Sequence, residues 1–151
     1  MIRLRTCKQK RGYCGPAALK IVLDFYGIHY LQQQLAKFTN TTPDGGCAEE
    51  DMVKFARKIG LKAYIKERSS LKELKKLNKK NIPVIIDWFS PEEAGHYSVI
   101  AGFRGDYIFI ADPHFGKIMK RKIGWFEERW FDMPFSKYKS IREIIVIEKI
   151  K

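Results

Sequence analysis

The sequence has few cysteines, no long hydrophobic run and a shortage of acidic residues. Among its 151 residues, apolar segments such as Val84-Ile85-Ile86 are far too short to cross a bilayer. The N-terminus carries positive charge but no apolar stretch behind it, which excludes a secretory signal and leads us to expect a cytoplasmic protein. Three cysteines without a Cys-x-x-Cys pair fit neither a disulfide scaffold nor a zinc site, and leave catalysis or burial as their roles.

Acidic residues are outnumbered by basic ones, 17 to 29, so the formal net charge is +12. Such a protein can attract nucleic acid, an acidic peptide or an anionic membrane. The densest basic group has helical spacing, and we interpret it as the solvated face of an amphipathic helix. Its members are Lys72, Lys75, Lys76, Lys79 and Lys80. No nucleic-acid motif accompanies this charge, so nucleic acid is not expected as a partner.

The order of hydrophobic patterns predicts helices first and strands second. Helices are expected over 16–26 and 31–38. A third should end at Gly60 and turn four apolar residues inward, namely Met52, Phe55, Ala56 and Ile59. A fourth should begin at Ser70, where Ser-Leu-Lys-Glu73 has the pattern of a capping box. Short strands rich in β-branched residues follow at 82–89, 97–103, 107–111, 117–122 and 144–150, whereas 125–132 is ambiguous. No linker divides the chain. We therefore expect one α+β domain over 1–151, with helices packed on an antiparallel sheet.

Cys14 is the first residue with a chemical signature. It lies just ahead of a predicted helix start, where unpaired backbone N–H groups favour the reactive thiolate. Gly15 permits a tight entry and leaves space for a substrate. The Gln9 amide, five residues upstream, could form an oxyanion hole with the Cys14 backbone N–H. The alternative is a buried structural cysteine at a helix start.

His96 and Asp112 are brought together by the predicted hairpin around Gly105. If Gly105 is its centre, residues whose numbers sum to about 210 face each other, which puts Asp112 one diagonal step from His96. Asp112 could then hold the imidazole tautomer and leave the other ring nitrogen for a thiol. A lone histidine at a strand edge is otherwise more often a surface or core residue.

These motifs together resemble the double-glycine leader peptidases. This papain-like cysteine peptidase family often forms the N-terminal domain of bacteriocin-exporting ABC transporters. The resemblance extends from about Gln9 to Gly116 and rests on Gln9 before Cys-Gly-Pro-Ala-Ala-Leu19, the helix end Tyr26-Gly27, Gly95-His-Tyr-Ser-Val-Ile100 and Ala111-Asp-Pro113. It implies Cys14 as nucleophile, His96 as base and later acid, Asp112 as orienting acid and Gln9 as oxyanion donor. Peptide hydrolysis through an acyl-thioester, without metal or cofactor, is the implied reaction.

The sequence departs from that family in two respects. Tyr13 stands where transporter-linked members usually have aspartate before the nucleophile, and the chain contains neither membrane helices nor an ATP-binding motif. Both point to a free-standing relative, for which any transporter would be a separate chain. Two alternatives use the same fold: a non-catalytic peptide-binding module, and an acyl transferase or deamidase with the same triad, since the acyl-enzyme forms in either reaction.

Three further residues are weaker site candidates. His114 could compete as a site residue, although a place in the loop after the strand accounts for it. Cys47 is expected in the first turn of a helix, facing the core. Cys7 is close enough in sequence to Cys14 for a regulatory disulfide, but no redox motif supports one.

Overall fold

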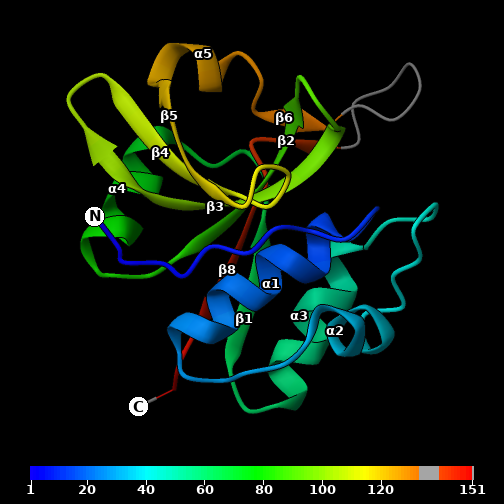
Figure 1. The fold of residues 1–151 in the computed structure, drawn as a ribbon. Helices are drawn as coiled ribbons and strands as arrows, with labels where there is room; N and C mark the ends of the chain where they lie inside the picture. Colours follow the sequence, from blue (N-terminus) through cyan, green and yellow to red (C-terminus); the bar gives the residue numbers. More distant parts are fainter. Residues whose placement is uncertain (133–139, 151) are drawn as a thin grey trace.

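A computed structural model describes residues 1–132 and 140–150 of the chain (Figure 1). The described residues form five helices: α1 (Cys14–Phe25), α2 (Gln32–Phe38), α3 (Glu49–Lys58), α4 (Leu71–Lys79) and α5 (Ile123–Glu127). The strands are β1 (Lys62–Lys66), β2 (Val84–Ser90), β3 (Ala94–Arg104), β4 (Tyr107–Asp112), β5 (Lys117–Lys122), β6 (Phe131–Asp132), β7 (Ser140–Ile141) and β8 (Ile144–Glu148). The predicted α+β class is confirmed.

Six of the strands form one antiparallel sheet in the order β1-β8-β2-β3-β4-β5. β3 lies inside this sheet, between β2 and β4, and joins β4 through a tight turn at Gly105, whose φ of 56° suits glycine. The remaining two strands, β6 and β7, pair with each other in a separate sheet. The long strand β3 thus lies inside the sheet and packs next to α1 (Figure 1).

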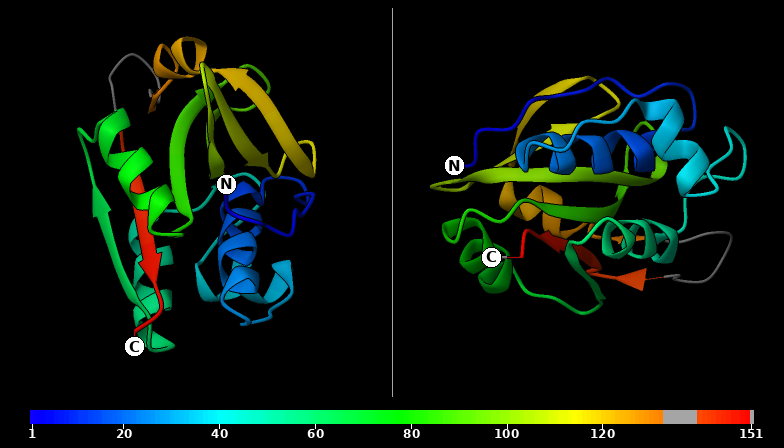
Figure 2. Two further views of the ribbon diagram at one scale, coloured as in Figure 1. Left: turned by 90° about the vertical axis from the view of Figure 1, so that its left-hand side faces the viewer. Right: turned by 90° about the horizontal axis from the view of Figure 1, so that it is seen from below.

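Apolar side chains cover both faces of this sheet. On one face Ile85 of β2 joins a cluster with the buried sides of α1, α2 and α3. On the other face its neighbours Val84 and Ile86 pack with α4 and α5. The two further views in Figure 2 show α1 and α4 on different sides of the sheet. Because β2 is buried on both faces, it appears in the sequence as a continuous apolar run instead of an alternating one.

The first helix, α1, is the most deeply buried helix next to the sheet. Its residues from Gly15 to Leu19 are all buried, and it ends at Tyr26 and Gly27, where the φ of 77° at Gly27 fits the predicted glycine stop. Pro16 stands in the first turn, where no backbone N–H is needed. The burial of α1 fixes the position of Cys14, its first residue.

The structure corrects two sequence predictions and assigns one segment that the sequence left open. Strand β1 lies between α3 and α4, so helices and strands are not fully separated along the chain. The ambiguous segment 125–132 contains the end of α5 and the strand β6. At α4, Ser70 Oγ accepts the Glu73 N–H as predicted, but Lys66 Nζ binds the Glu73 carboxylate at 2.6 and 2.8 Å and so takes it away from a capping box.

Membrane-spanning helices are not found in the described part of the chain, where every helix is too short or too polar to cross a bilayer.

Candidate active site

Cys14 is the first residue of α1 and remains partly exposed, whereas the rest of the first two turns is buried. Tyr13 caps the helix without a side-chain hydrogen bond to it. The first N–H groups of a helix have no partner within the helix, and the positive end of the helix dipole lies there. Cys14 thus lies at a helix start, partly exposed and beside the unpaired N–H groups of the first turn.

His96 and Asp112 meet as the hairpin register predicts. Val99 pairs with Ala111, so the numbers of facing residues sum to 210 at this end of the hairpin. His96 Nε2 lies 2.6 Å from Asp112 Oδ1, and both side chains are almost fully buried. Because a carboxylate only accepts, Nε2 carries the proton in this bond. The bond orients the imidazole and leaves Nδ1 as its second functional atom.

The Nδ1 atom of His96 is buried and forms no hydrogen bond with the residues that the structure describes. The Cys14 side chain is the neighbour that acts on this ring. Burial by itself lowers the pKa of His96. The hydrogen bond to Asp112 and the interaction with Cys14 outweigh this effect and raise the pKa to about 9. An imidazolium that persists above neutral pH is the partner that a thiolate needs.

Gln9 lies in an N-terminal segment fastened to the loop after β4. Its backbone N–H donates to Pro113 O at 2.8 Å. A Cβ atom on Gly116 would lie only 2.8 Å from Cβ of Lys8, so only glycine fits against this segment. Gln9 is therefore held directly against Pro113, the residue after Asp112. The four residues singled out in the sequence come from this segment, the start of α1, β3 and the end of β4.

Glu93 is a residue near this site that the sequence analysis did not identify. In the turn between β2 and β3, its Oε1 accepts from Gln9 Nε2 at 3.2 Å and its Oε2 lies 2.9 Å from His114 Nδ1. His114, predicted to lie in the loop after the strand, does so, and its backbone N–H donates to Asp112 Oδ1 at 3.0 Å. Glu93 lies three positions before His96. This closeness in sequence is the one signal that could have drawn attention to Glu93.

Gly15 was predicted to leave space for a substrate. This prediction is wrong, because Cys47 occupies that space. A Cβ atom on Gly15 would lie 2.5 Å from Cβ and 2.8 Å from Sγ of Cys47. Cys47 precedes α3, and Tyr97 Oη donates to its carbonyl oxygen at 2.8 Å. Burial, and less strongly the nearby Cys14, raise the pKa of the Cys47 thiol. Glycine at position 15 thus allows α1 to approach the loop before α3.

A group of buried carboxylates lies close to Tyr97. Oxygen atoms of Glu49, Asp87 and Glu143 are within 4.8 Å of one another, an arrangement that can hold a cation. Burial, followed by the charge of Asp132 and then that of Glu49, raises the pKa of Asp87 to about 10. Asp87 is therefore protonated at neutral pH, and its neutral form explains its burial without a metal.

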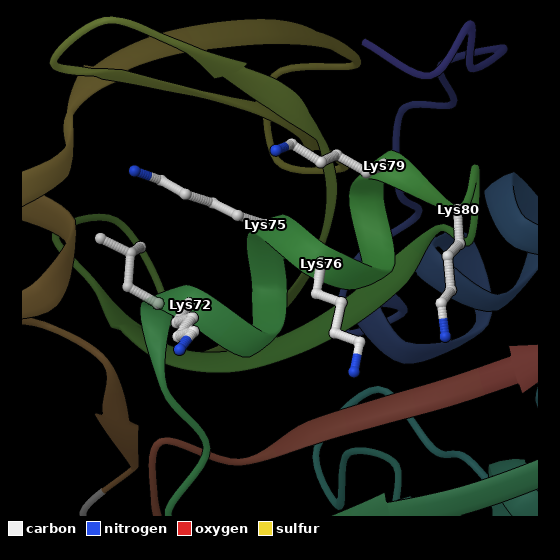
Figure 3. Close-up of a pocket in the computed structure, with 6 residues that line it drawn as sticks. Lys72, Lys75, Lys76, Lys79 and Lys80 are labelled. Atoms are coloured by element: carbon white, nitrogen blue, oxygen red, sulfur yellow. The ribbon is translucent and has the colours of Figure 1, made fainter.

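The lysine cluster of α4 lies away from these residues. Its five lysines line a surface depression together with Leu71, and Figure 3 shows Lys75 and Lys79 directed to one side of the helix and Lys76 and Lys80 to the other. None of the five forms an ion pair with another described residue. α4 packs on the sheet face opposite α1, so this depression is separate from Cys14.

Solved structures with the same fold are peptidase domains. The peptidase domain of Streptococcus ComA, a bifunctional ABC transporter, matches with a TM-score of 0.78 and 20% identity, covering 99% of this chain and 100% of that one. A double glycine motif protease from an AMS/PCAT transporter, solved with its leader peptide, matches with a TM-score of 0.76 and 24% identity, covering 98% and 93%. At these identities the two structures establish the fold.

Sequence comparison gives the family. The chain is 34% identical over 137 residues to the transport/processing ATP-binding protein ComA of Streptococcus pneumoniae, a match that covers 86% of this chain. The chain spans only 18% of the length of that relative. The family model matches residues 2–138, nearly the whole sequence. The protein belongs to the Peptidase_C39 like family.

Proposed function

We propose that this protein is a cysteine peptidase, a single domain over 1–151, with Cys14 as nucleophile, His96 as general base and acid, Asp112 as orienting residue and Gln9 as oxyanion donor. The observation that carries the proposal is the 2.6 Å bond between His96 and Asp112, which leaves Nδ1 as the free ring nitrogen, and it is supported by the interaction with Cys14 that raises the pKa of His96. The arrangement is that of a nucleophile, a base and a group that orients the base.

The reaction begins with the Cys14 thiolate and the His96 imidazolium. The thiolate attacks the carbonyl carbon of the scissile bond, and the negative charge on the carbonyl oxygen is stabilised by the Cys14 backbone N–H and the Gln9 amide. His96 gives its proton to the leaving amine, and an acyl-thioester remains on Cys14. His96 then takes a proton from water, whose oxygen attacks the thioester, and hydrolysis restores the thiolate–imidazolium pair.

The proposed substrates are peptides with Gly-Gly before the scissile bond, as in the processed leader peptides of the relatives. The described residues around Cys14 support a restricted site, because Gly15 is closely packed against Cys47. An ABC transporter is the partner class that the relatives suggest. The cytoplasm suits the reaction, because a thiol nucleophile needs reducing surroundings.

Two measurements on the same variants test this proposal. Alkylation of Cys14 by iodoacetamide, followed by peptide mass spectrometry across pH, reports the thiolate. Cleavage of a peptide with Gly-Gly before an aminocoumarin amide reports turnover. We expect His96→Ala to slow alkylation below pH 8 and to abolish cleavage. His29→Ala is the matched control, since His29 is an exposed histidine paired with Asp24.

The results separate the candidate functions. If Cys14 reacts no faster than a free thiol in the wild type, or if His96→Ala changes nothing, the active-peptidase reading fails and a peptide-binding module is the better account. If an ordinary amine such as glycine amide, added at millimolar concentration, receives most of the acyl group in competition with water, acyl transfer replaces hydrolysis.

A further inference from the structure

We propose that Glu93 is a positioning residue that orients the Gln9 amide for the oxyanion hole, and that His114 holds Glu93 in place. The inference rests on the proposed function, because the oxyanion exists only if Cys14 attacks a carbonyl. It adds two residues to the site, neither of which belongs to the Cys-His-Asp arrangement.

The first step concerns which way the Gln9 amide faces. An amide group can be turned by 180°, which exchanges its donor and its acceptor. Glu93 Oε1 lies 3.2 Å from Gln9 Nε2, and an ionised carboxylate can only accept a hydrogen bond. The turned amide would place two acceptor oxygens against each other. Glu93 therefore selects the orientation in which Gln9 Nε2 faces the Glu93 carboxylate.

The second step concerns the remaining hydrogen of Nε2. An amide nitrogen carries two hydrogens, and Glu93 uses one of them. The other stays available for the oxygen of a substrate carbonyl. The Gln9 Oε1 atom is buried without a hydrogen-bond partner among the described residues, so no other bond fixes this amide. Without Glu93 the donor would lose its defined direction, and a donor is effective only when it is directed in advance.

The third step concerns what holds Glu93. Its backbone N–H donates to Ser90 Oγ at 2.9 Å, which closes the turn between β2 and β3. His114 Nδ1 lies 2.9 Å from its second carboxylate oxygen, and both side chains are only partly exposed. The His114 backbone N–H in turn donates to Asp112. A continuous set of hydrogen bonds thus connects the predicted oxyanion donor to the residue that orients His96.

The experiment compares four variants, Glu93→Ala, Glu93→Gln, Gln9→Ala and Gln9→Ala with Glu93→Ala, by cleavage of the Gly-Gly aminocoumarin peptide. Glu93→Ala should lower kcat about tenfold with little change in KM. Glu93→Gln should also lower kcat, because its amide can donate to Gln9 Oε1 as well as accept from Nε2 and so no longer selects one orientation. In a Gln9→Ala background, Glu93→Ala should cause no further loss, because the two residues act as one unit. Glu92→Ala is the matched control, since Glu92 is exposed and adjacent in sequence.

Several results would overturn the proposal. These are a full further loss from Glu93→Ala in the Gln9→Ala background, wild-type turnover in Glu93→Gln, and unchanged turnover in Glu93→Ala. Alkylation of Cys14 should be equal in the wild type and Glu93→Ala, because it needs no oxyanion hole. A parallel loss of alkylation would mean that Glu93 acts on the thiolate or on the fold instead.

A readout without turnover separates this proposal from the proposed function. In protein labelled with ¹⁵N-glutamine, the Gln9 side-chain NH₂ should exchange with solvent faster in Glu93→Ala than in the wild type or Glu92→Ala. If no peptide is cleaved but this difference is present, the proposed function fails while the orientation of Gln9 by Glu93 stands. If exchange at Gln9 is the same in all three proteins, the orienting bond is absent and the proposal fails.

Discussion

Replacing Asp112 with Asn would test the proposed triad at its most buried hydrogen bond. Asn has the same shape as Asp but no charge, so the packing around position 112 should be preserved. The bond to His96 is 2.6 Å long, and the His96 ring is fully buried, so water cannot replace the lost charge. The imidazolium form of His96 should therefore be the form that the substitution destabilises.

The size of the effect follows from that bond. A buried hydrogen bond between charged groups contributes about 1.5–3 kcal/mol. One pKa unit corresponds to about 1.4 kcal/mol, so the pKa of His96 should fall by about 1–2 units from its value of about 9. The same free energy, removed from the thiolate–imidazolium pair, should lower kcat/KM by about 10- to 150-fold.

The assay is the rate of Cys14 alkylation by iodoacetamide at pH 8 and at pH 10. At pH 8 Asp112→Asn should react about two- to tenfold more slowly than the wild type, because a fall of the His96 pKa from about 9 by about 1–2 units leaves half or more of the imidazole neutral at that pH. At pH 10 a thiol ionises unaided, and the two proteins should react alike. Asp106→Asn, at the exposed hairpin turn, is the control. Equal alkylation of wild type and a folded Asp112→Asn at pH 8 would refute the reasoning.

Three other substitutions give measurable outcomes. Asp87→Asn should stabilise the fold by about 1 kcal/mol or more, and by more at pH 9 than at pH 5. The reason is that the raised pKa of Asp87 makes the wild type lose stability as pH rises from about 4 towards 10. Equal gains in the free energy of urea unfolding at both pH values would contradict this. Gly15→Ala should cost about 1–3 kcal/mol in thermal unfolding through its clash with Cys47, and Cys47→Gly should recover part of the loss. Charge reversal at Lys72, Lys75 and Lys76 in α4 should slow cleavage of an acidic peptide about tenfold at low salt without changing kcat. An unchanged cleavage rate would exclude attraction of the peptide by the lysine cluster of α4.

Local patterns in the sequence were sufficient for most of the elements and for the pairing of His96 with Asp112. A helix start just after Cys14 followed from Pro16 and the apolar spacing behind it, and the structure begins the helix at Cys14. The pairing of His96 with Asp112 followed from one turn glycine, although the hairpin contains a register shift between Ile100 and Gly102 that the sequence did not reveal. Strand β1 was missed because Lys62–Lys66 alternates only weakly and is recognisable as a strand only beside β8. Its partner lies more than 70 residues away in the sequence, beyond the reach of any local pattern.

The tertiary structure alone decided which residues surround the triad. Glu93 is an ordinary turn residue in the sequence, and its contact with Gln9 spans 84 positions of the chain. The same holds for Cys47, which fills the space in front of Gly15 that the sequence had suggested for a substrate. Periodicity and spacing depend on the backbone of one helix or one hairpin, so they are readable from the sequence. Contacts between distant loops depend on how the packed elements meet, and only the folded chain specifies them.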